Sequence, residues 1–115
     1  MRIHHVALRT RDIARLTAFY CEVLAFVISD RHAARSVWLR AGDAIVMIEQ
    51  ADSAEPEPAA GSMDMIAFCI DPRDRANFEA RFAAAGVVVE ARTAYTLYVR
   101  DPDGRRVGLS HYPET

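Results

Sequence analysis

The chain has no lysine, only two cysteines and no long apolar run among its 115 residues. The two cysteines sit inside apolar stretches without a close CxxC spacing, which favours buried, reduced thiols over a disulfide. No apolar stretch approaches the roughly 18 residues that a membrane-spanning helix needs. The formal net charge of -2 gives no electrostatic reason to expect nucleic acid or an acidic membrane surface. We therefore expect a cytoplasmic protein with neither kind of partner.

The composition that remains is that of one globular domain, with 51% hydrophobic and 26% charged residues. The segment 51–62, ADSAEPEPAAGS, is acidic, contains two prolines and has no apolar periodicity. Such a segment is typical of an exposed linker. We therefore divide the single domain 1–115 into a first module (1–50), this linker (51–62) and a second module (63–115).

The first module predicts one strand, one helix and three further strands. RIHHVALR alternates as a strand does, with His5 on one face and His4 on the other, packed under the helix. Thr10 is the predicted cap of a helix whose apolar residues recur at helical spacing up to Leu24. Three β-type runs follow, namely FVISD, RSVWLRA and DAIVMIEQ.

The second module predicts the same order of elements. MDMIAFCI reads as a strand, Asp71-Pro72 supplies a helix cap and first residue, and Gly86 suits a left-handed helix end. The strands VVVEAR, AYTLYVR and RRVGLSHY complete it, with DPDG as the turn between the last two.

The two modules can be superposed as sequences, which indicates an internal duplication. HVAL (5–8) matches MIAF (65–68), and VWLR (37–40) matches LYVR (97–100). MIEQ (47–50) then falls on GLSH (108–111), because the DPDG turn is one residue longer. The predicted fold class is α+β, with two βαβββ modules in tandem.

The segment IHHVALRTRDIARLTAFYCEVLAF resembles the first module of the vicinal oxygen chelate superfamily, which includes glyoxalase I, bleomycin resistance proteins and extradiol dioxygenases. The matching pattern, D-x6-F-Y-x-x-V-L-x-F, is met by Asp12, Phe19, Tyr20, Val23, Leu24 and Phe26. DPDGRRVGL is similar to the closing hairpin of that superfamily. The resemblance implies a mixed, curved sheet that forms a cupped cleft, a small-molecule ligand or substrate, and a homodimer.

The resemblance also implies where a metal would bind in members that have one. Their ligands, histidine or glutamate, fall on His5, Met47, Met65 and Gly108, of which only the first is a metal ligand. Thioethers are poor ligands for hard divalent cations. We therefore predict no metal or other cofactor. The alternative is a weak divalent-metal site of His5 and Glu49 with waters, because strand alternation turns Asp64 and His111 to the other face.

The candidate site residues follow from this placement. His5 is either a hydrogen-bonded wall residue or a general acid or base acting with Glu49. Trp38 and Tyr98 occupy equivalent positions, and either pack under the helices or line a binding face. The predicted ligand-binding set is Trp38, Met47, Met63, Met65, Tyr98 and Ser110.

Two functions remain open from the sequence. The first is a small-molecule-binding protein of the glyoxalase and bleomycin resistance type, with a degenerate metal site and an apolar or aromatic ligand in the sheet cleft. The alternative is an atypical lyase, isomerase or dioxygenase-like enzyme that uses His5 and Glu49 for proton transfer or weak metal binding. The missing ligands favour the first, and the retained histidine keeps the second open.

Overall fold

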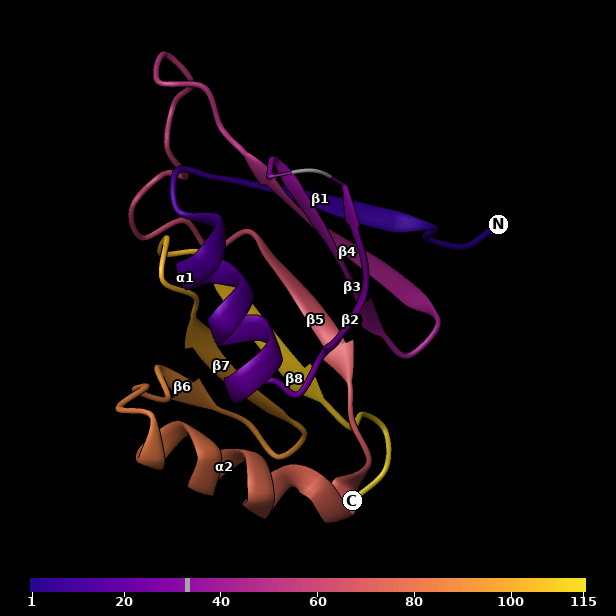
Figure 1. Cartoon of the computed structure of the whole chain (residues 1–115). Helices are drawn as coiled ribbons and strands as arrows, with labels where there is room; N and C mark the ends of the chain where they lie inside the picture. Colours follow the sequence, from indigo (N-terminus) through magenta and orange to yellow (C-terminus); the bar gives the residue numbers. More distant parts are fainter. Residues whose placement is uncertain (33) are drawn as a thin grey trace. The chain divides into compact units, whose positions relative to one another are not determined.

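A computed structural model of the chain describes residues 1–32 and 34–115. Its contacts divide the chain into two compact units, Met1–Glu57 (unit 1) and Pro58–Thr115 (unit 2). Each unit contains one four-stranded mixed sheet and helical segments, which confirms the α+β fold and the two similar modules (Figure 1). None of the helices in the described ranges is long and apolar enough to cross a membrane.

Unit 1 follows the predicted order of elements. They are β1 (His5–Thr10), α1 (Ile13–Ala18), the π-helix η1 (Phe19–Val23), β2 (Val27–His32), β3 (Ser36–Ala41) and β4 (Ala44–Gln50). The sheet order is β1-β4-β3-β2, with β1 parallel to β4 and the other pairs antiparallel. The core consists of apolar residues from one face of the sheet and from the helices. It includes Leu8, Leu16, Phe19, Tyr20, Val37, Leu39, Val46 and Ile48.

The first helix begins two residues later than the sequence predicts. Thr10 is the buried last residue of β1, and its hydroxyl accepts a hydrogen bond from the Asp12 amide at 3.2 Å. Asp12 is the N-cap instead, because its carboxylate accepts the Arg15 amide hydrogen at 3.0 Å. The predicted Thr10 cap is therefore wrong. Thr10 serves the turn that leads into the cap.

Unit 2 repeats the pattern. Its elements are β5 (Met65–Cys69), the 3-10 helix η2 (Pro72–Asp74), α2 (Arg75–Ala84), β6 (Ala91–Arg92), β7 (Thr96–Arg100) and β8 (Arg106–Ser110). The sheet order is β5-β8-β7-β6, with β5 parallel to β8. Its core includes Phe82, Leu97, Val99, Val107 and Leu109.

Both predicted ends of the second helical segment are confirmed. Asp71 caps it by accepting the Arg73 amide hydrogen at 2.9 Å, with Pro72 in the first position. Gly86 has φ of +70°, and the Val87 amide donates to the Phe82 carbonyl at 2.8 Å. This left-handed cap satisfies carbonyls that the helix end leaves unpaired.

Other expectations are corrected. The predicted strand VVVEAR is reduced to the two residues of β6, although the Glu90 amide still donates to the Tyr98 carbonyl at 2.8 Å. His4 is exposed rather than packed under the helix. Both cysteines are free, as predicted, but Cys69 is exposed and Cys21 is half-buried, so neither is a fully buried thiol.

The strand registers confirm the duplication residue by residue. In unit 1, Met47 of β4 lies between Ala7 of β1 and Trp38 of β3. In unit 2, Gly108 of β8 lies between Ala67 and Tyr98 in the same way. Met47 and Gly108 are therefore equivalent positions, as are Trp38 and Tyr98.

Candidate functional site

Trp38 and Met47 share the face of the unit 1 sheet that points away from its core. Their strand neighbours Val37, Leu39 and Ile48 are at most 4% exposed, whereas Trp38 and Met47 are half-buried. Because successive side chains alternate between faces, Trp38 does not pack under α1. The Trp38 indole Nε1–H donates to Ser36 Oγ at 3.2 Å, which ties the ring to the same face. This arrangement leaves an aromatic and thioether surface beside Ala7.

His5 and Glu49 lie on that same face but are not brought together. His5 pairs with Ile45, and Glu49 pairs with Arg9. Four residues of strand separate the two pairs, which is about 13 Å along the sheet. The exposed His5 ring contacts His4 instead, with their Nδ1 atoms 2.8 Å apart, and Glu49 lies 3.5 Å from the Arg9 guanidinium. A direct proton transfer between His5 and Glu49 does not fit this spacing.

Tyr98 and Met65 occupy the corresponding face in unit 2. Met65 is 42% exposed and pairs with Arg106 of β8, while Tyr98 pairs with Gly108. Gly108 is itself buried, and a Cβ placed there would lie 3.2 Å from the Ala67 Cβ. The absence of a side chain at Gly108 therefore lets β5 and β8 pack closely at Ala67, next to Tyr98.

A guanidinium covers the Tyr98 ring, and the sequence reasoning missed it. The Arg106 Cζ atom lies 4.1 Å from the ring centroid, which is a cation–π contact. Glu90 accepts hydrogen bonds from both Arg106 and Arg100, at 3.0 and 2.6 Å. The two arginines hold the pKa of the Glu90 carboxyl below its usual range. Arg106 stands two residues before Gly108, so strand alternation could have placed it on this face, whereas nothing in the sequence pointed to Glu90.

The remaining candidates lie at the edges of the unit 2 face. Met63 is 63% exposed, and its sulfur lies 3.9 Å from a guanidinium nitrogen of Arg100. Ser110 accepts a hydrogen bond from the Thr96 hydroxyl at 2.9 Å. Asp64 is exposed just before β5.

His111 is a buried structural residue. It is 6% exposed, its Nε2 lies 3.2 Å from the Arg75 guanidinium, and its Nδ1 contacts the carbonyl of Glu114. Both ring nitrogens are thus engaged within unit 2, so His111 is not offered to a metal ion.

Comparison with known proteins decides the family. The profile of the Glyoxalase/Bleomycin resistance protein/Dioxygenase superfamily matches residues 2–109. The chain belongs to this superfamily. A virulence protein of Salmonella typhimurium is 31% identical to it over 122 residues, covering 96% of this chain and 84% of that protein.

Solved structures of the superfamily type share the fold. A fosfomycin resistance protein, FosX, from Mesorhizobium loti has a TM-score of 0.78 at 23% identity, covering 95% of this chain and 90% of its own. A lactoylglutathione lyase from Agrobacterium tumefaciens has a TM-score of 0.71 at 23% identity, covering 96% and 93%. At these identities the likeness establishes the fold of the chain and not its reaction.

The superfamily's metal chemistry does not fit the residues found here. The positions that resemble its ligand positions hold Met47, Met65 and Gly108, which offer two thioethers and no side chain. Divalent zinc, iron, nickel or manganese needs nitrogen and oxygen ligands in such a site. Within residues 1–32 and 34–115, no three His, Cys, Asp or Glu side chains are grouped to hold a metal ion. We therefore derive no step through a metal.

The predicted linker is tied to β1 by ion pairs. Glu55 accepts two hydrogen bonds from the Arg9 guanidinium, at 3.0 and 2.6 Å. Arg11 pairs with Glu57 at 2.7 Å and donates to the Glu55 carbonyl at 2.6 Å. Arg9 therefore lies between Glu49 on the sheet and Glu55 in the linker.

This contact predicts a pH dependence. Hydrogen bonds from Arg9 and from the Asp52 amide lower the pKa of the Glu55 carboxyl from 4.5 to about 2. Because the pKa is depressed in the folded chain, the pair stabilises fully above pH 4.5 and the contribution is lost as the pH falls towards 2. Glu55→Gln should flatten the dependence of unfolding on pH in this window, measured by urea denaturation. Glu57→Gln is the matched control, and an equal flattening there would contradict the assignment.

Proposed function

We propose that this superfamily member binds a small apolar or aromatic molecule on one of its sheet faces, the unit 1 face that carries Trp38 or the unit 2 face that carries Tyr98, without a metal ion. The observation that supports it is the replacement of metal-ligand positions by methionine and glycine next to half-buried aromatic rings. Met47 adjoins Trp38, and Gly108 adjoins Tyr98. Polarizable thioethers and aromatic faces are the lining that small-molecule sites use.

Each predicted residue has a distinct role in this proposal. Trp38 and Met47 provide the apolar surface in unit 1, and Tyr98, Met65 and Met63 provide it in unit 2. The Ser110 hydroxyl can donate a hydrogen bond to a ligand oxygen. Arg106 keeps the Tyr98 ring in place and adds a positive charge over its face.

The enzyme alternative has less support. Proton transfer by His5 and Glu49 would need a shared substrate that spans about 13 Å of sheet, since the residues cannot meet directly. Glu49 also forms an ion pair with Arg9 at 3.5 Å, so its carboxylate already has a protein partner. We retain His5 as a hydrogen-bonding wall residue of the proposed site. The homodimer stays a prediction, which sedimentation velocity would check.

The proposal predicts a ligand-dependent change in the emission of Trp38, the one tryptophan of the chain. A thermal-shift screen should combine aromatic and apolar compounds with two polar anions, fosfomycin and lactoylglutathione, because related proteins carry those names. A ligand at 100 times its dissociation constant stabilises the fold by about 2.7 kcal/mol. Its binding should quench or shift Trp38 emission.

Variants separate binding on this face from binding elsewhere. Met47→Ala should weaken a ligand of the unit 1 face about tenfold, and Tyr98→Ala should do the same for a ligand of the unit 2 face, a loss of about 1.4 kcal/mol in either case. The control is Asn77→Ala, an exposed position on α2. Equal weakening by the control would contradict the assigned face. A stoichiometric divalent metal in protein purified without chelator would contradict the metal-free proposal.

A further inference from the structure

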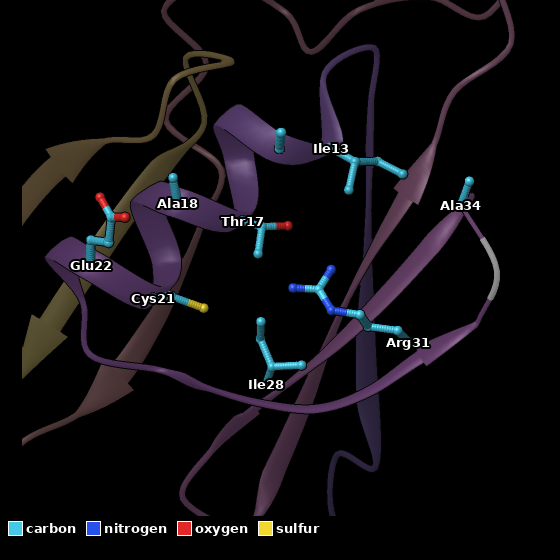
Figure 2. Close-up of a pocket in the computed structure, with 9 residues that line it drawn as sticks. Ile13, Thr17, Ala18, Cys21, Glu22, Ile28, Arg31 and Ala34 are labelled. Carbon is cyan, nitrogen blue, oxygen red and sulfur yellow. The ribbon is translucent and has the colours of Figure 1, made fainter.

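A concave feature lies on the helix-covered face of the unit 1 sheet, opposite the face that carries Trp38. It is a pocket of about 500 Å³ between the helical segment and β2, within the 300–1,000 Å³ range of small-ligand sites. Its lining is mostly aliphatic. Thr17, Cys21 and Arg31 are the groups near its middle that can hydrogen-bond or carry charge, and Glu22 lies at the far end (Figure 2). It is lined by Ile13, Ala14, Thr17, Ala18, Cys21, Glu22, Ile28, Arg31 and Ala34.

A bulge in β2 gives the pocket its positive charge. Ile28 pairs with Leu39 and Arg31 pairs with Val37, and both partners face the core under the helices. Residues three apart on a regular strand would point to opposite faces. The register shifts between Ile28 and Asp30, which turns Arg31 to the same side as Ile28. Figure 2 shows the Arg31 guanidinium pointing from β2 towards Thr17 on the helix.

The described residues supply no partner to the Arg31 guanidinium or to the Thr17 hydroxyl. No ion pair or side-chain hydrogen bond within the described ranges holds the guanidinium of Arg31. Thr17 is 9% exposed, and its Oγ1 is a buried side-chain oxygen for which the described part of the chain supplies no partner. An unsatisfied buried hydroxyl costs about 1–3 kcal/mol, so it indicates a missing hydrogen-bonding group. Helical threonines use two χ1 rotamers. Rotation between them exchanges the positions of the Thr17 hydroxyl and methyl groups, so either group can face the pocket.

Neither of the other two polar groups of the pocket, Glu22 and Cys21, neutralises the charge of Arg31. The Glu22 carboxylate is turned away from Arg31 at the far end (Figure 2). Burial raises the pKa of the Cys21 thiol, which therefore stays neutral and neither neutralises Arg31 nor acts as a nucleophile. Ile13, Ala18 and Ile28 give an aliphatic wall around the charge.

We propose that this pocket binds a small aliphatic carboxylate, whose charged group is held by Arg31 and the Thr17 hydroxyl and whose alkyl chain packs on the isoleucines. A guanidinium matches a carboxylate with two parallel hydrogen bonds, and a hydroxyl donates a third. The site is separate from the aromatic faces of the proposed function, because it lies on the other side of the sheet.

Octanoate is the probe that tests this proposal, by calorimetry and by methyl NMR of the whole chain. Saturable binding is expected with a dissociation constant of about 0.1–1 mM. The methyl signals of Ile13, Thr17 and Ile28 should shift. Octylamine and octanol, which keep the chain but lack the negative charge, should bind at least tenfold more weakly.

Three variants assign the contacts. Arg31→Gln should weaken octanoate at least tenfold. Thr17→Val keeps the side-chain shape, so it should weaken octanoate about threefold to tenfold while leaving the fold at least as stable as before. Arg40→Gln is the control, because Arg40 is exposed and alternates to the opposite face from Leu39.

Several results would overturn the proposal. These are no saturable binding below about 1 mM, equal affinity for octanol, unchanged affinity in Arg31→Gln, or a loss in Arg40→Gln as large as that in Arg31→Gln. A shift of the Trp38 ring signals without a shift at Thr17 would place octanoate on the aromatic face instead. That result would leave the proposed function standing.

Discussion

Replacing Phe82 with alanine is expected to lower the free energy of unfolding by about 3–5 kcal/mol. Phe82 is 0% exposed and is the buried residue that α2 contributes to the core of unit 2. Truncation removes the burial of an aromatic ring and leaves a cavity in a close-packed core, which the neighbouring side chains cannot fill without moving. Domains of this size are stabilised by only about 5–15 kcal/mol, so the loss is a large share. Urea denaturation followed by far-UV circular dichroism measures it.

Phe78 provides the matched control for this substitution. It lies one turn earlier on α2, with its ring centroid 6.4 Å from that of Phe82, but it is only half-buried. Phe78→Ala should therefore cost about 1–2 kcal/mol. If both variants lost the same free energy, the core of unit 2 would not be centred on Phe82.

The sequence predicted the elements well because periodicity and local caps determine them. The repeat between HVAL and MIAF placed equivalent strands correctly, and Asp71-Pro72 and Gly86 fixed both ends of the second helical segment. The shift of the first cap from Thr10 to Asp12 was missed, because both residue types cap helices. Only the path of the chain out of β1 shows that Thr10 is buried at the strand end. The shortening of the predicted strand VVVEAR to β6 was also missed. A strand needs a hydrogen-bonded partner as well as β-propensity, and of this described segment only Ala91 and Arg92 pair with β7.

The candidate site was less predictable because strand parity does not determine register. Alternation correctly placed His5, Met47 and Glu49 on one face. It did not say that His5 lies opposite Ile45 and Glu49 opposite Arg9, which separates them. The β2 bulge that turns Arg31 into the helix-side pocket likewise has no sequence signal in this chain. Side-chain pairs such as Arg106 with Glu90 depend on the path of an irregular segment.

Replacing Asp101 with alanine is expected to cost about 2–4 kcal/mol, because this turn residue is a buried hydrogen-bond acceptor. Its side chain is 0% exposed. Its Oδ1 accepts the amide hydrogens of Asp103 at 2.8 Å and Arg105 at 3.1 Å, and its Oδ2 lies 3.4 Å from the Arg105 guanidinium. The sequence identified DPDG as a turn, but the structure shows that its first carboxylate organises the connection between β7 and β8. Alanine leaves two backbone donors and one guanidinium without this partner.

The loss should also reach the candidate ligand face, since Arg106 follows directly after Arg105 and stacks on Tyr98. In Asp101→Ala, hydrogen exchange of the β8 amides should be faster. The Tyr98 ring should also lose its cation–π contact with the Arg106 guanidinium. Asp103→Ala is the control, because it removes a partly exposed ion pair at 3.2 Å that contributes about 0–1 kcal/mol. Denaturation curves and amide exchange of both variants test the comparison. If Asp101→Ala changed stability but left β8 exchange and the Tyr98 ring unaltered, the turn would support the fold without positioning the Arg106–Tyr98 contact.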